Sequence, residues 1–164
     1  MKRIIFIAAI GAVVASWGKV HTLLGIHEGP KMYSIGNYSN DKWYQGAHGY
    51  EEAIRISQEQ KSPMIIYVYA DWCRYCKEFQ STLLVDGDVK STLNNYIKVT
   101  LNPDKNEADK ALYKRWGGGG YPTLLMQSGA GKPLRLNAPY YRDGNGWKML
   151  SSPQFISLLK RYSS

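Results

Sequence analysis

Two cysteines three positions apart constrain this chain most, because they are the only cysteines in its 164 residues. Cys73 and Cys76 follow the apolar, β-rich run Met64–Tyr69, and Cys76, Phe79 and Leu83 then recur at helical spacing. This periodicity places the pair where a strand ends and a helix begins. A helix N-terminus favours a thiolate, because its unpaired N–H groups carry the positive end of the helix dipole. The pattern predicts that Cys73 is the exposed nucleophile and that Cys76, which is more enclosed, resolves the mixed disulfide.

Three other interpretations of the cysteine pair are weaker. A tetrahedral zinc site needs four ligands, and the sequence has no second cysteine pair and no closely spaced histidine pair. An inert disulfide across three residues would constrain the unfolded chain little. Two buried free cysteines would pack as small hydrophobes, which gives no reason for their position at a strand-to-helix junction. We therefore expect redox chemistry with no metal and no cofactor beyond the Cys73–Cys76 disulfide.

The N-terminus has the form of a targeting segment. Two basic residues precede the apolar run Ile4–Trp17, and Val13–Ala15 fits a signal-peptidase site. The alternative is an uncleaved membrane anchor, but a spanning helix needs about 20 apolar residues, and Lys19 interrupts the run. We expect a signal peptide or membrane anchor over 1–18 and a linker or wrapping arm over 19–49. Either form predicts a periplasmic or secreted domain, with a tether to the inner membrane as the anchored variant.

The charge of the chain indicates no nucleic-acid partner. The formal net charge is +8, from 21 basic and 13 acidic residues. The lysines and arginines are spread singly, without the basic run or arm that is typical of nucleic-acid binding. Solubility, or a preference for acidic partner surfaces, accounts for this charge.

The rest of the chain alternates strand and helix signals from residue 50 to residue 164. Tyr50 and Ser57 lie on one face of a predicted helix that should stop before Pro63. Ser152 followed by proline predicts the start of the last helix. Between them we predict, in order, the strand 64–69, the cysteine helix, a helix over 89–96, the strand 97–101, a helix over 108–116 that ends at the tetraglycine 117–120, the strand 123–127 and a hairpin into 132–136.

This order of elements resembles a known fold. Together with the motifs Trp72–Lys77 and Gly120–Thr123, it looks like a thioredoxin-fold thiol:disulfide oxidoreductase. Within that superfamily, the stretch Tyr69–Phe79 most resembles the C-terminal thioredoxin-like domain of the bacterial transmembrane thiol:disulfide interchange protein. The resemblance implies an α/β, thioredoxin-like fold over 50–164, with a central mixed sheet of about four strands flanked by helices.

The resemblance also implies a function. It suggests an enzyme of the cell envelope that reduces disulfides in exported proteins, with an upstream electron donor or acceptor protein as its second partner. It implies a cis peptide at Tyr121–Pro122, where these two residues shape the substrate groove and Trp72 borders it. The alternatives are a disulfide oxidase or isomerase, and a Cu(I)-binding thiol module of a different class.

Several positions depart from the family or bear on tuning of the thiol. Tyr67 stands where many thioredoxins carry a buried aspartate that takes the proton of the resolving thiol, so transfer must use water or another group such as Glu78. Arg74 would stabilise the Cys73 thiolate, whereas Asp71 would oppose it.

Two stretches also differ from the usual pattern. Gly118 and Gly119 replace a branched and a polar residue, and we expect them to add backbone freedom beside the proline. The stretch 137–151 is longer than the usual link to the last helix. Its aromatic residues and arginine are typical either of an interface or of packing over the core edge.

Overall fold

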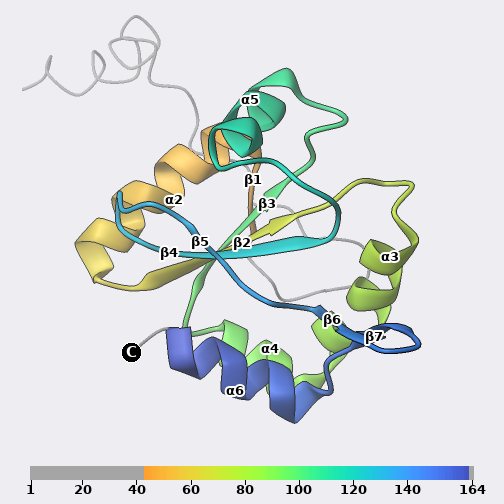
Figure 1. The fold of residues 1–164 in the computed structure, drawn as a ribbon. Helices are drawn as coiled ribbons and strands as arrows, with labels where there is room; N and C mark the ends of the chain where they lie inside the picture. Colours follow the sequence, from red (N-terminus) through yellow and green to blue (C-terminus); the bar gives the residue numbers. More distant parts are fainter. Residues whose placement is uncertain (1–42, 163–164) are drawn as a thin grey trace, which may run out of the picture.

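The computed structural model describes residues 43–162 (Figure 1). The predicted signal or anchor segment at 1–18 and most of the predicted linker at 19–49 lie outside these residues. Within the part described, no helix is long and apolar enough to cross a membrane.

A five-stranded mixed sheet forms the centre of the fold, in the order β1-β3-β2-β4-β5. Strand β3 runs parallel to both β1 and β2, whereas β4 is antiparallel to β2 and to β5. The central strand β2 is buried at every position after its first residue, because helices cover both faces of the sheet. The strands are β1 Trp43–Gln45, β2 Pro63–Val68, β3 Ile97–Leu101, β4 Thr123–Ser128 and β5 Leu134–Arg135.

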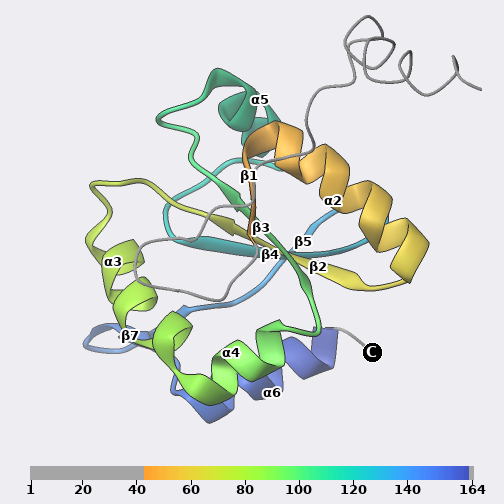
Figure 2. The same ribbon diagram turned by 180° about the vertical axis from the view of Figure 1, so that it is seen from behind.

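Helices on the two faces of the sheet enclose two separate hydrophobic cores (Figures 1 and 2). Because side chains alternate along β2, Ile65 and Tyr67 enter one core, and Met64, Ile66 and Val68 enter the other. Helices α2 and α5 cover the second core, whereas α3, α4 and α6 cover the first, which contains the cysteine pair. The helices are α2 Gly46–Gln60, α3 Arg74–Ser81, α4 Gly87–Leu93, α5 Glu107–Arg115 and α6 Ser152–Tyr162, with a 3₁₀ turn η1 at Leu83–Val85.

The predicted domain boundary at residue 50 is too late. Trp43–Gln45 pairs with β3 as an edge strand of the main sheet, and helix α2 already begins at Gly46. Trp43 is fully buried against the ring of Tyr67. Three residues are too few to show a hydrophobic period, so the sequence could not distinguish this strand from a linker. The sheet therefore has one strand more than expected, while the thioredoxin-like arrangement is confirmed.

The long link before the last helix contains a second, small sheet. Strands β6 Tyr140–Asp143 and β7 Gly146–Met149 pair as an antiparallel hairpin. We predicted a link of unusual length here and assigned no strands to it. Gly144 and Asn145, between the paired residues Asp143 and Gly146, are a typical two-residue hairpin loop. This signal in the sequence could have identified the hairpin.

Candidate functional site

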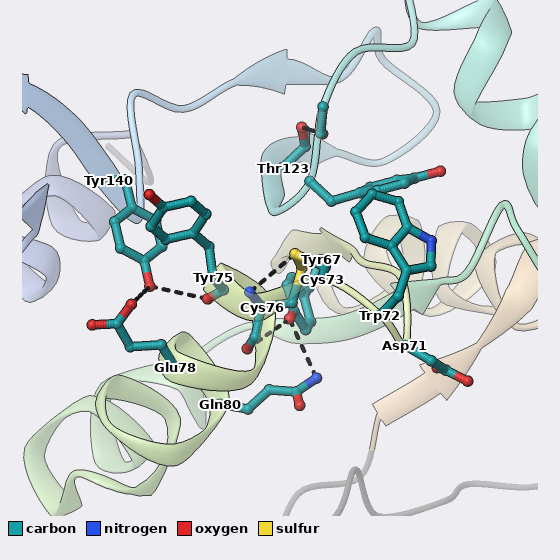
Figure 3. The surroundings of a disulfide bond; sticks show 12 residues. Tyr67, Asp71, Trp72, Cys73, Tyr75, Cys76, Glu78, Gln80, Thr123 and Tyr140 are labelled. Carbon is teal, nitrogen blue, oxygen red and sulfur yellow. Dashed lines mark hydrogen bonds between the residues drawn. A yellow bond between two sulfur atoms is a disulfide. The ribbon is translucent and has the colours of Figure 1, made fainter. Parts of the chain in front are cut away.

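The two cysteines form a disulfide at the N-terminus of α3, as their spacing predicts (Figure 3). Cys73 occupies the N-cap of the helix, and the backbone N–H of Cys76 donates a hydrogen bond to its sulfur over 3.0 Å. The backbone carbonyl of Cys73 accepts from the N–H of Lys77 at 3.1 Å. The helix terminus therefore offers one of its unpaired donors directly to the sulfur that we predicted to be the nucleophile.

The predicted exposure of Cys73 is wrong for this oxidised state. Cys73 is 3% exposed and Cys76 is 1% exposed, so both belong to the core beneath α3. In the disulfide, each sulfur shields the other from solvent. Tyr121 packs against the same core. Both sulfurs are thus nearly inaccessible in the disulfide, and the nucleophilic role of Cys73 and the resolving role of Cys76 stay predictions.

A neutral pair of side chains replaces the buried aspartate beneath Cys76. The Tyr67 hydroxyl donates to the backbone carbonyl of Cys76 at 3.4 Å and accepts from the Gln80 amide at 3.3 Å. Tyr67 is fully buried and its ring contacts Phe79 edge to face. Sequence reasoning noted Tyr67 as a departure but missed Gln80, whose role is visible only from its contact with the hydroxyl.

Glu78, which we considered as a proton acceptor for the thiol, is not brought to the sulfurs. Its side chain is exposed and points away from the disulfide (Figure 3). Its carboxylate accepts a hydrogen bond from the Tyr140 hydroxyl at 3.0 Å. Glu78 faces the β6–β7 hairpin, because Glu78 lies on the side of α3 that is turned away from the buried residues Cys76 and Phe79.

The two charges expected to tune the thiol differ in their surroundings. Asp71 accepts from the Asn102 amide at 3.0 Å and forms an ion pair with Lys105. The hydrogen bond and charge of Asp71 raise the pKa of Lys105. Its negative charge is thus largely compensated locally, whereas exposed Arg74 has no carboxylate within ion-pair distance among residues 43–162.

Trp72 and Tyr121 border the disulfide and share one carboxylate. The Trp72 indole N–H donates to Oδ2 of Asp104 at 2.5 Å, and the Tyr121 hydroxyl donates to its Oδ1 at 3.0 Å. The two rings meet edge to face at 5.9 Å, although Trp72 remains 70% exposed. Burial, followed by the hydrogen bond to Asp104, raises the pKa of Tyr121 to about 12. No motif in the sequence around Asp104 points to this contact, so it was missed.

Contacts with Arg135 tie down the loop before Pro122, whose glycines we expected to add backbone freedom. The Tyr121–Pro122 peptide is cis, as the resemblance implies. Arg135 donates to the carbonyl of Gly118 and, at 2.7 Å, to the hydroxyl of Thr123. Gly119 has a φ of +129°, and a Cβ there would lie 3.3 Å from the Arg135 guanidinium. Glycine is needed for this close approach, which the structure uses to fix the loop.

The described residues contain no obvious metal centre. Over 43–162, no group of three or more His, Cys, Asp or Glu side chains is placed to hold a metal ion. The chemistry that the site does display is the Cys73–Cys76 disulfide, which lies between a helix N-terminus and the cis-proline loop.

Comparison with known proteins agrees with this geometry. Residues 42–127, more than half of the chain, match the family described as thioredoxin-like. The thiol:disulfide interchange protein DsbD of Escherichia coli K12 is 37% identical over 78 residues, which cover 47% of this chain and 14% of that protein. The DsbD of Yersinia pestis is 32% identical over 80 residues, covering 48% of this chain and 13% of that protein. The chain thus corresponds to a small part of these relatives.

A solved structure shows the same fold. The oxidised C-terminal domain of Neisseria meningitidis DsbD superposes with a TM-score of 0.54 at 19% identity, covering 73% of this chain and 98% of that domain. The suspected likeness to the DsbD C-terminal domain is thereby confirmed. The chain belongs to the thioredoxin-like family, and its Cys73–Cys76 pair is that of a thiol:disulfide oxidoreductase.

Proposed function

We propose that this protein reduces disulfides in exported proteins within the cell envelope. The observation that carries the proposal is the Cys73 sulfur at the N-terminus of α3, where it accepts a hydrogen bond from the Cys76 amide. The likeness to the interchange proteins supports a role in thiol exchange between proteins. The basic and apolar N-terminal sequence supports export.

The surroundings of the sulfurs favour reduction over oxidation. Among the described residues, the Cys73 sulfur accepts one hydrogen bond, which comes from the Cys76 amide. Strong oxidants of this kind stabilise their reduced form, which requires several groups that favour the thiolate. Here the pair beneath Cys76 is a neutral hydroxyl and a neutral amide. A weakly stabilised thiolate leaves the reduced form less stable, so the dithiol gives up its electrons to a partner more readily and is the better reductant.

The reaction proceeds by two thiol exchanges. In the reduced protein, the Cys73 thiolate attacks a disulfide of the partner, so a Cys73–partner bond forms, the partner's own S–S bond breaks, and the released thiolate takes up a proton. The Cys76 thiolate then attacks Cys73, which forms the disulfide seen here and releases the second partner thiol. Two electrons pass to the partner, and a dithiol protein upstream must return them.

The direction is tested by redox equilibrium and by turnover. The purified protein is equilibrated with mixtures of reduced and oxidised glutathione, and its insulin reductase activity with dithiothreitol is measured alongside a Cys73→Ser variant. A potential more reducing than that of glutathione, with activity lost in Cys73→Ser, is expected. A potential well above that of glutathione would assign the protein to the oxidases or isomerases instead.

The compartment and partners require a separate test. Cys76→Ala prevents release of the mixed disulfide, so proteins attacked by Cys73 remain covalently bound and can be identified from intact cells. We expect exported proteins that contain disulfides. Trapping of cytosolic proteins alone would contradict the proposed location.

A further inference from the structure

The β6–β7 hairpin forms a second wall beside the disulfide. A groove of about 390 Å³ runs between the cis-proline loop Gly120–Thr123 on one side and the hairpin residues Tyr140 and Trp147 on the other. Tyr75, which lies between the two cysteines in sequence, also lines this groove. The groove therefore adjoins the segment that carries the two cysteines, with Tyr75 and Pro122 in its lining.

This wall is fixed to the helix that carries the cysteines. The Tyr140 ring packs edge to face on Tyr75 at 5.0 Å, and its hydroxyl lies 3.0 Å from both the Tyr75 carbonyl and the Glu78 carboxylate (Figure 3). At the other strand, Thr82 Oγ1 lies 3.3 Å from the sulfur of Met149. Contacts at both strands therefore hold the hairpin at α3 before any partner arrives, which lowers the entropic cost of binding.

The groove presents aromatic surface that no other part of the described chain covers. Trp147 is 58% exposed and Tyr75 is 42% exposed. The pairing of Arg142 with Trp147 and of Tyr140 with Met149 places Trp147 on the same face of the hairpin as Tyr140. Exposed aromatic side chains in a preformed groove are typical anchors for a partner's side chain.

The groove also contains an uncompensated positive charge. The Arg135 guanidinium lines it and donates to the neutral oxygens of Thr123 and Gly118. Over residues 43–162, no carboxylate lies within ion-pair distance of Arg135. Arginine has five N–H donors, so this guanidinium can still donate hydrogen bonds to a partner's carboxylate.

We propose that this groove selects disulfide partners by sequence. It takes an extended segment that places an aromatic or long aliphatic side chain against Trp147 and an acidic side chain against Arg135, next to the cysteine under attack. This inference rests on the proposed function, because the segment is bound at the site of thiol exchange. The excess of basic over acidic residues in the chain, with a net charge of +8, favours the same acidic partners.

The experiment uses short peptides that carry one cysteine as a mixed disulfide with thionitrobenzoate. Reduced Cys73 attacks the peptide sulfur and releases the coloured thiolate, and Cys76 then displaces the peptide thiol. The residues beside the cysteine are Phe and Glu, Ala and Glu, or Phe and Lys, and hydroxyethyl disulfide, which is neutral and has no aromatic ring, serves as the small disulfide. Arg135 is left intact because it holds the proline loop.

We expect Trp147→Ala to lower the rate constant for the Phe and Glu peptide about three- to tenfold, as for loss of an aromatic pair. The rate with the small disulfide should stay unchanged. Tyr141→Ala is the matched control, since Tyr141 is exposed on the opposite face of the hairpin. The Phe and Lys peptide should react more slowly than the Phe and Glu peptide, and the difference should shrink at high salt.

Binding without turnover separates this inference from the proposed function. The Phe and Glu peptide with serine in place of cysteine is titrated into the oxidised protein by calorimetry, and its affinity should fall in Trp147→Ala. If this peptide still binds to a protein that cannot reduce the small disulfide, the proposed function is refuted and the inference about the groove is not. Equal losses for peptide and small disulfide, indifference to the peptide's charge, or a dimer in sedimentation that Trp147→Ala abolishes would overturn the inference.

Discussion

The hydroxyl of Tyr67 donates to the backbone carbonyl of Cys76 at 3.4 Å, directly beneath the redox-active pair. The Gln80 amide donates to the same hydroxyl at 3.3 Å, so a neutral chain of hydrogen bonds links strand β2 to helix α3. A carboxylate in this position would ionise, whereas a tyrosine hydroxyl stays neutral near physiological pH. The carbonyl of the second cysteine is thus bound by a hydroxyl group that an amide supports, with no carboxylate in this chain of hydrogen bonds.

Replacing Tyr67 by Phe should destabilise the fold. The change keeps the ring contacts with Phe79 but leaves the Gln80 amide without its acceptor, and we expect a loss of about 1 kcal/mol in the free energy of unfolding. Urea unfolding of the oxidised protein provides the measurement. Tyr75→Phe is the control, because the exposed Tyr75 hydroxyl makes no recorded hydrogen bond within the described residues. Equal stabilities of the two variants would contradict the structural role of the Tyr67 hydroxyl.

Replacing Tyr67 by Asp should add a titration to the site. Position 67 is fully buried, so desolvation should raise the pKa of the new carboxyl above its ordinary value. The rate at which iodoacetamide labels Cys73 in the reduced protein should then show one more inflection with pH than the unmodified protein shows. Tyr67→Asn supplies the control, since it removes the ring without introducing an ionisable group. An identical pH profile for the Asp and Asn variants would exclude a buried, titrating carboxyl at this position.

The parts of this fold that follow a local pattern could be predicted from the sequence. The apolar run of β2 and the helical spacing of Cys76 and Phe79 placed the disulfide correctly. The edge strand at Trp43 was missed because it is defined by pairing with β3, which lies far along the chain. Secondary-structure patterns report local preferences, and such pairings are not local.

The details of the site depended on contacts between distant residues. Asp104 joins Trp72 and Tyr121 from a turn whose sequence indicates only the turn itself. Arg135 fixes the glycine loop from strand β5, and nothing in its neighbouring sequence points to that contact. Each side chain acts through a partner that only the tertiary fold brings near, so no motif could have identified them.

Replacing Gly119 by Ala should disturb the cis-proline loop. The backbone φ of +129° is unfavourable for a residue with a side chain, and the added Cβ would lie 3.3 Å from both the Arg135 guanidinium and the Tyr113 hydroxyl. We expect a loss of about 1–3 kcal/mol in unfolding free energy, together with slower reduction of insulin. Gly120→Ala is the matched control, because a Cβ at Gly120 meets no atom within 4 Å. Unchanged stability in Gly119→Ala would show that the loop relaxes without loss of the Arg135 contacts.

Replacing Asp104 by Asn should lower the pKa of Tyr121 toward its ordinary value of 10.0. Burial contributes most to the raised pKa, the hydrogen bond and charge of Asp104 come next, and Tyr113 adds a smaller contribution. Because the folded-state pKa of about 12 exceeds the unfolded value, Tyr121 contributes its full stability below pH 10.0 and loses it as the pH rises toward 12. The variant should lose less stability than the unmodified protein across that interval.

Carbon-13 NMR of labelled tyrosine measures this pKa, with the Tyr121 signal identified by its absence in Tyr121→Phe. Asp88→Asn is the control, since Asp88 is exposed in the first turn of α4. Asparagine offers one oxygen and one NH2 group in place of two carboxylate oxygens, so Trp72 can keep its acceptor while the NH2 group donates to the Tyr121 hydroxyl instead of accepting from it. A Tyr121 pKa that stays near 12 in Asp104→Asn would contradict a contribution of the Asp104 carboxylate to this pKa and would leave burial as its main cause.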